Sequence, residues 1–148
     1  MKKPRILLAD DHPDMLTALC DLVEDGLGEV VGMVTDGQAL VDAAQRLKPD
    51  VIISDISMPG LNGLDATRAL QAIVPQSKVI ILTVHREPVY VSLAFKAGAR
   101  GYILKRCAHQ GELSQALLHV LAGDRYLGLG VEAREEWERA DDEKLSVR

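Results

Sequence analysis

Short apolar runs alternate with amphipathic stretches along the first 123 residues, and this alternation limits the possible folds more than any other feature. The apolar runs are rich in β-branched residues and nearly continuous, which is typical of strands buried on both faces of a parallel sheet. They occupy Ile6–Ala9, Val30–Val34, Val51–Ile53, Val79–Leu82 and Gly101–Leu104. Five buried strands are therefore predicted.

The intervening stretches repeat apolar residues at helical spacing, so each predicts a helix with one buried stripe. The first contains Met15, Leu16, Leu19 and Val23, and the last contains Leu113, Ala116, Leu117, Val120 and Leu121. Strands that alternate with helices indicate an α/β fold with right-handed crossovers and helices on both faces of the sheet. We expect a doubly wound, five-stranded parallel sheet in the order 2-1-3-4-5.

Composition narrows the class of protein. Aromatic residues make up only 3% of the chain, so the core must be aliphatic, and the net charge of −5 argues against nucleic-acid binding by this stretch. The sequence has no apolar run as long as a membrane span requires, and its two cysteines, Cys20 and Cys107, show no motif spacing. We expect free thiols, no membrane partner and a cytoplasmic location.

The character of the chain changes after Gly123. Residues 124–131 are turn-rich, and residues 132–144 are dense in charge and contain the single tryptophan, Trp137. A charged linker or solvated helix is expected there, with a helix docked through Trp137 as the alternative. The predicted organisation is one domain over residues 1–125, followed by a charged linker or helix over residues 126–148.

Polar residues follow four of the predicted strands. Asp10 and Asp11 follow the first, Asp55 the third, Thr83 the fourth and Lys105 the fifth. The carboxyl ends of parallel strands meet at one edge of an open sheet, where ligands bind. A single aspartate after a strand is usually a turn or helix-capping residue, but this whole set at successive strand ends indicates a site.

The chemistry of these residue types points to phosphoryl transfer. Three neighbouring carboxylates repel one another, and a divalent cation such as Mg²⁺, which prefers oxygen ligands, would relieve that repulsion. Asp55 supplies a nucleophilic carboxylate, while Lys105 and Thr83 supply donors for the oxygens of a phosphoryl group. Asp55 is thus the expected phosphoacceptor, with Thr83 and Lys105 assisting.

Several motifs resemble those of receiver domains from bacterial two-component response regulators. They are Ile6-Leu7-Leu8-Ala9-Asp10-Asp11-His12, Ser54-Asp55-Ile56-Ser57-Met58-Pro59-Gly60-Leu61-Asn62-Gly63, Leu82-Thr83 and Lys96-Ala97-Gly98-Ala99-Arg100-Gly101-Tyr102-Ile103-Leu104-Lys105. The resemblance spans roughly residues 5–123. It implies the flavodoxin-like fold and a sensor histidine kinase as phosphoryl donor.

The resemblance also implies a metal site. Asp11, Asp55 and the backbone carbonyl of Ser57 match direct Mg²⁺ ligands, and Asp10 matches an acidic neighbour that acts mainly through water.

Other positions match the family's switch. Thr83 and Lys105 match residues that contact the phosphoryl group, and Tyr102 matches an aromatic residue whose ring turns inward when the threonine moves. An ordinary half-buried strand aromatic is the alternative for Tyr102. Val84 stands where a smaller residue is common in the family.

The sequences Asp10-Asp11-His12-Pro13 and Thr83-Val84-His85 resemble the NarL/FixJ, or LuxR-type, subfamily. His12 and His85 are expected at the rim of the site, without a metal role. The final Leu145-Ser146-Val147-Arg148 resembles the opening of that subfamily's helix-turn-helix domain. This implies a switch that controls transcription through a domain absent from this chain. DNA contact is expected only through that domain, and a homodimer is a further possible assembly.

Three other functions compete with this interpretation. A stand-alone receiver that acts through protein–protein contacts is the alternative to a transcription regulator. A phosphatase using Asp55 is disfavoured because Ser57, Met58 and Pro59 are poor general acids, and a nucleotide or flavin binder is disfavoured because no glycine-rich loop follows the first strand. The chain is therefore not expected to be an enzyme beyond its own phosphorylation and dephosphorylation.

Overall fold

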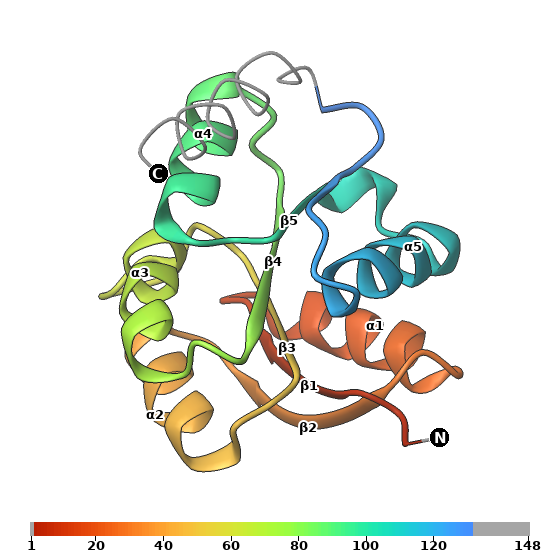
Figure 1. Ribbon diagram of the computed structural model, residues 1–148, viewed down its shortest axis with the longest axis horizontal. Coiled ribbons are helices and arrows are strands. Elements are labelled where there is room, and N and C mark those ends of the chain that lie inside the picture. The colour runs from red at the N-terminus through yellow and green to blue at the C-terminus, as the bar shows by residue number, and fades with distance from the viewer. Residues whose placement is uncertain (1, 132–148) are drawn as a thin grey trace.

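A six-stranded parallel sheet lies between two layers of helices (Figure 1) in the computed structural model, which describes residues 2–131. The strands are β1 (Arg5–Ala9), β2 (Glu29–Val34), β3 (Val51–Ser54), β4 (Lys78–Thr83), β5 (Gly101–Leu104) and β6 (Tyr126–Leu127). The helices are α1 (Pro13–Glu24), α2 (Gly37–Leu47), α3 (Gly63–Ile73), α4 (Pro88–Ala97), the 3₁₀ turn η1 (Lys105–Cys107) and α5 (Gln110–Leu121).

The strand order is β2-β1-β3-β4-β5-β6, so the predicted order of the first five strands is confirmed. The added strand, β6, pairs in parallel with the outer edge of β5, with Gly101 opposite Tyr126 and Tyr102 opposite Leu127. Two residues are too few to show the period-2 pattern by which strands are detected in sequence. The predicted domain boundary at residue 125 stays a prediction, but the chain past it continues along the sheet.

The sheet is buried on both faces, as its continuous apolar runs predict. Successive strand residues point to opposite faces. Leu7, Ile52 and Ile81 therefore pack in one cluster with α2, α3 and α4. Residues of the other parity, such as Ile6 and Ile53, pack in a second cluster with α1 and α5. Figure 1 shows these two helical layers on either side of the strands.

Local sequence sets where the helices begin. The side chain of Asp36 accepts a hydrogen bond from the Ala39 amide at the start of α2, and Asn62 does the same for Asp65 at the start of α3. Proline opens α1 and α4, where its missing N–H costs nothing. These starts hold the loops after the strands at the carboxyl edge of the sheet.

The other predictions from the sequence concern the cysteines, membrane spans and the C-terminal segment. Cys20 and Cys107 are both free thiols. Within residues 2–131, no helix is both long and apolar enough to cross a membrane. The charged segment with Trp137, and the match at Leu145–Arg148, lie outside the described residues.

Candidate functional site

Asp10 and Asp11 extend directly from β1 at the carboxyl edge of the sheet. Asp10 is only 2% exposed, and its Oδ1 accepts a hydrogen bond of 2.9 Å from the His12 amide. This local turn fixes the carboxylate at the end of the strand. Asp11 is less buried and stands next to the exposed imidazole of His12.

Asp55 directly follows β3, the strand adjacent to β1, and is 4% exposed. Its Oδ1 accepts a hydrogen bond of 2.7 Å from the Ile56 amide. Gly63 at the start of α3 lies against the same loop, where a Cβ atom would lie 1.9 Å from the Asp55 carbonyl oxygen. Only glycine allows α3 to begin this close to Asp55, so the helix packs directly against the Asp55 backbone.

Lys105, at the end of β5, bridges two of these carboxylates. Its Nζ lies 2.7 Å from Asp10 Oδ2 and 2.9 Å from Asp55 Oδ2. Burial by itself lowers the pKa of the lysine, but the hydrogen bonds and charges of Asp10 and Asp55 outweigh burial and raise the pKa. Lys105 is therefore a permanent cation at neutral pH.

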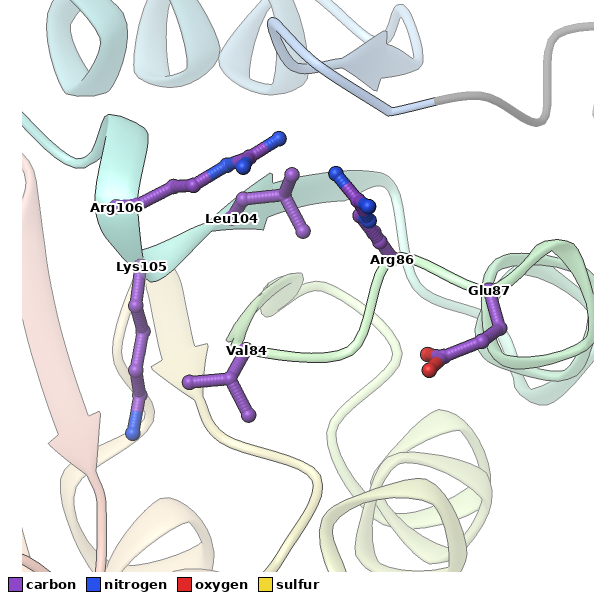
Figure 2. A pocket seen from close by; sticks show the side chains of 6 residues that line it. All are labelled: Val84, Arg86, Glu87, Leu104, Lys105 and Arg106. Carbon is purple, nitrogen blue, oxygen red and sulfur yellow. The ribbon is translucent and has the colours of Figure 1, made fainter.

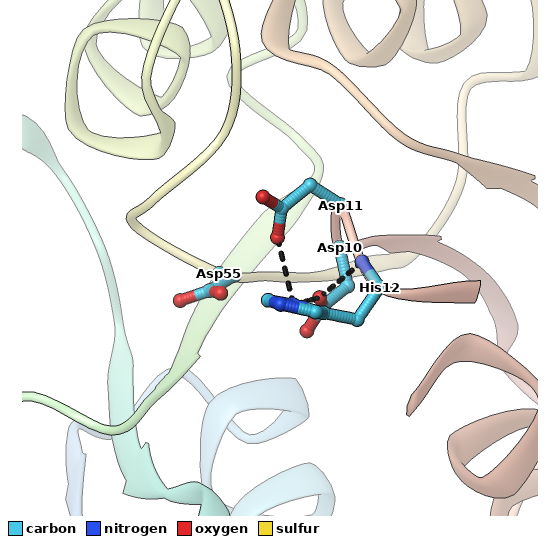
Figure 3. A group of neighbouring side chains, drawn as sticks. All are labelled: Asp10, Asp11, His12 and Asp55. Carbon is cyan, nitrogen blue, oxygen red and sulfur yellow. Dashed lines mark hydrogen bonds and ion pairs between the residues drawn. The ribbon is translucent and has the colours of Figure 1, made fainter. Parts of the chain in front are cut away.

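One ammonium does not neutralise three carboxylates. Ligand atoms of Asp10, Asp11, His12 and Asp55 all lie within 4.8 Å of one another (Figure 3). Asp11 Oδ1 is buried without a hydrogen bond, although His12 Nδ1 approaches it to 2.9 Å. A buried carboxylate oxygen with unused acceptor capacity, among other carboxylates, suits a hard cation that takes oxygen ligands at short range.

Thr83 and Tyr102 are linked through His85. Thr83 is fully buried at the end of β4, and its Oγ1 accepts a hydrogen bond of 3.3 Å from the His85 amide. The hydroxyl of the fully buried Tyr102 donates to the His85 carbonyl. Burial, with the nearby charge of Glu87, raises the pKa of Tyr102 above its ordinary range, so the phenol remains a donor.

His85 also reaches the loop after β3. Its Nε2 lies 3.1 Å from Ser57 Oγ, and its ring stacks on Tyr90 with 4.4 Å between ring centroids. Ser57, His85 and Asp11 line one open depression beside Asp55. His85 therefore joins the loops after β3 and β4.

Comparison with known proteins identifies the family. The sequence model of the family described as response regulator receiver domain matches residues 6–118 of this chain. This chain belongs to that family. Receivers are signalling domains of two-component systems, and the acidic cluster at the sheet edge is of the kind that receivers generally use for Mg²⁺.

Relatives and a solved structure refine the assignment. The receiver is 38% identical to the response regulator GacA of Pseudomonas aeruginosa over 83% of its length, and 43% identical to the transcriptional regulatory protein DesR of Bacillus subtilis over 81%. It spans only 58% of GacA and 59% of DesR. A LuxR-family two-component response regulator from Aurantimonas sp. SI85-9A1 superposes with a TM-score of 0.81 at 29% identity, covering 97% of this chain and 99% of that one. The receiver is therefore of the NarL/FixJ, or LuxR-type, subfamily.

The structure brings Asp10, Asp11, Asp55 and Lys105 together, as the strand order led us to expect. The roles of these residues, and of Thr83, Tyr102 and the Ser57 carbonyl, stay predictions. Sequence reasoning left His85 at the rim and missed its links to Thr83, Tyr102 and Ser57. Its position two residues after Thr83 was the only available signal, and spacing alone does not show where a loop side chain turns.

Proposed function

We propose that this receiver accepts a phosphoryl group on Asp55 from a sensor histidine kinase and changes shape in response. The bridge formed by Lys105 between Asp10 and Asp55 supports this most directly. It places a cation beside the buried Asp55 carboxylate, the proposed nucleophile, at the carboxyl edge of the sheet. Asp11, Asp55 and the Ser57 carbonyl would hold Mg²⁺, with Asp10 acting through water. When bound, the cation would neutralise charge on the phosphoryl oxygens.

Asp55, the Ile56 amide and Lys105 would have separate roles in the phosphoryl transfer. A carboxylate oxygen of Asp55 attacks phosphorus, and the bond between phosphorus and the donor imidazole nitrogen breaks as the new P–O bond forms. Hydrogen bonding of Asp55 Oδ1 to the Ile56 amide holds the carboxylate in one orientation for that attack. Lys105 Nζ is within reach to donate to a phosphoryl oxygen while it keeps its contact with Asp10.

The hydrogen bonds of His85 offer a route from phosphorylation to a change of shape. New negative charge on Asp55 would draw the Thr83 hydroxyl away from the His85 amide, which it now binds. The His85 carbonyl, which accepts from Tyr102, would shift with its loop. The face formed by α4, β5 and α5 would then change, and this change would drive dimerisation or release an output domain.

We infer that the output is control of transcription through a domain beyond this chain. DesR is named a transcriptional regulatory protein, and it is longer than the region the receiver matches. A stand-alone receiver acting through protein contacts remains the alternative. The coding sequence downstream of residue 148 distinguishes them, because only the first continues into a DNA-binding domain.

A mass measurement tests the phosphoacceptor. The chain is incubated with Mg²⁺ and a small acyl phosphate, and its intact mass should increase by one phosphoryl group. Asp55→Asn should abolish the increase, whereas Asp65→Asn, a matched change on the exposed surface of α3, should preserve it. Phosphorylation of Asp55→Asn to the wild-type extent would refute the assignment.

A further inference from the structure

We propose that the acidic segment over residues 132–143 docks back onto this receiver, in a basic groove beside β5, with Trp137 in the apolar part of that groove. The proposal goes beyond phosphorylation of Asp55 and does not depend on it. It rests on two arginines that have no ion-pair partner within residues 2–131, on the path of the chain that leads to them, and on the charge of the segment that follows.

The groove lies between the loop after β4 and the end of β5 (Figure 2). We define this exit groove by its lining residues, Val84, Arg86, Glu87, Leu104, Lys105 and Arg106. Its volume of about 260 Å³ suits one large side chain. Val84, which is 70% exposed, forms the apolar wall of the groove with Leu104.

Two cations border the groove without an internal partner. Figure 2 shows the guanidinium groups of Arg86 and Arg106 on the same side of the groove, near Leu104, with the Glu87 carboxylate turned away from them. Neither arginine has a hydrogen bond or ion pair with any residue in the range 2–131. Lys105 points to Asp10 and Asp55 instead. Planar guanidinium groups so placed suit carboxylates, which they bind through paired hydrogen bonds.

The chain is led to this groove by a strap, which we define as residues 124–131. The buried carboxylate of Glu112 accepts hydrogen bonds from the Tyr126 hydroxyl and, at 2.6 Å, from the Leu129 amide. Gly128 donates to the Tyr102 carbonyl at 2.8 Å. A Cβ atom on Gly130 would lie 3.3 Å from Arg106 Nη2, so the strap passes directly beside the groove.

The segment that follows Val131 has complementary charge. Residues 132–143 contain seven carboxylates and two guanidinium groups, a net charge of −5. Trp137 is only six residues past Val131, a distance of up to about 20 Å in an extended chain. Tryptophan buries a large apolar surface and is a frequent anchor in contacts of this kind. The length, charge and starting point of the segment therefore all favour docking within the same chain.

Trp137 is the only tryptophan, so its fluorescence reports docking directly. Acrylamide quenching of the full chain is measured at low ionic strength without a phosphodonor, at several protein concentrations. Trp137 should be protected, and Arg86→Glu with Arg106→Glu should shift its emission to the red and lower the docked-to-free ratio roughly fivefold, as expected for two exposed ion pairs. High salt should have the same effect on the wild type.

Matched variants make the test specific. Arg46→Glu with Arg68→Glu changes net charge equally on α2 and α3 and should leave Trp137 protected. Glu135→Arg with Glu136→Arg changes only the acidic segment and should expose Trp137, while the free energy of unfolding of the receiver stays as in the wild type. Equal accessibility of Trp137 in all these proteins would overturn the proposal. Protection that disappears on dilution would also overturn it, by assigning the groove to a second copy of the chain.

Discussion

Two groups of buried carboxylates in this receiver have opposite relations to their surroundings. Glu112, in the first turn of α5, is 3% exposed, and its two oxygens accept hydrogen bonds from Tyr126 and Leu129. At the carboxyl edge of the sheet, Asp10 and Asp55 share the single ammonium of Lys105. Asp11 Oδ1, beside them, is buried and accepts no hydrogen bond.

The difference lies in how many donors the fold supplies to each carboxylate. A buried carboxylate that fixed donors satisfy completely stabilises the structure that holds those donors, so Glu112 fastens the strap to α5. Carboxylates that outnumber their donors repel one another and favour the binding of a cation. The same functional group is thus fully supplied with donors at one place and short of donors at the other.

The largest expected effect is on the anchor. Glu112→Ala should lower the free energy of unfolding by about 3 kcal/mol, because it leaves the Tyr126 hydroxyl and the Leu129 amide without their acceptor. Urea denaturation measures this. Glu112→Gln, which keeps one acceptor oxygen, should lower the free energy of unfolding by less than Glu112→Ala does. If Glu112→Ala were as stable as the wild type, Glu112 would not be an anchor.

The second-largest expected effect is stabilisation by Mg²⁺ at the carboxyl edge of the sheet. Mg²⁺ at about a hundred times its Kd should raise the free energy of unfolding by about 2.7 kcal/mol, because it binds only the folded receiver. Asp11→Asn should lose this gain, whereas Glu112→Gln should retain it. Thermal unfolding with and without Mg²⁺ tests both variants, and an equal gain in Asp11→Asn would remove Asp11 from the metal site.

A smaller effect should have the opposite sign from the first. Without divalent cations, Asp11→Asn should stabilise the receiver by about 1 kcal/mol, because it removes one of the repelling charges from a partly solvated cluster. Glu112→Gln under the same conditions should destabilise it. Urea denaturation in the presence of a chelator compares them. Destabilisation by both substitutions would abolish the distinction between anchor and site.

The smallest effect is expected at alkaline pH. Burial first, and then the hydrogen bond and charge of Glu112, raise the pKa of Tyr126 above its ordinary value. The unfolded chain therefore releases this proton first, so stability is fully present below about pH 10 and falls as pH rises through the folded pKa. Tyr126→Phe should lessen this fall.

Two other groups contribute to the same alkaline loss. Lys105 and Tyr102 also have raised pKa values, which gives the same sign, so part of the loss should persist in Tyr126→Phe. Urea denaturation on either side of about pH 10 measures it. An unchanged pH dependence in Tyr126→Phe would show that the Tyr126–Glu112 contact does not persist in solution.

The sequence by itself determined the parallel sheet and the meeting of Asp10, Asp11, Asp55 and Lys105. Nearly continuous apolar runs located the strands, and parallel topology brings their carboxyl ends to one edge whatever the loops do. No comparable rule exists for β6 or for Glu112. Two strand residues have no detectable period, and a glutamate in the first turn of a helix is ordinary in sequence.

Only the tertiary structure decided which donors each polar group would find. The links from His85 to Thr83 and Tyr102, and from Glu112 to the strap, join segments whose approach depends on packing between elements rather than on local propensity. Hydrogen bonds act over about 3 Å, whereas sequence patterns place an element only to within a few residues. The position of the site therefore follows from chain topology, and its hydrogen-bond partners follow from packing between elements.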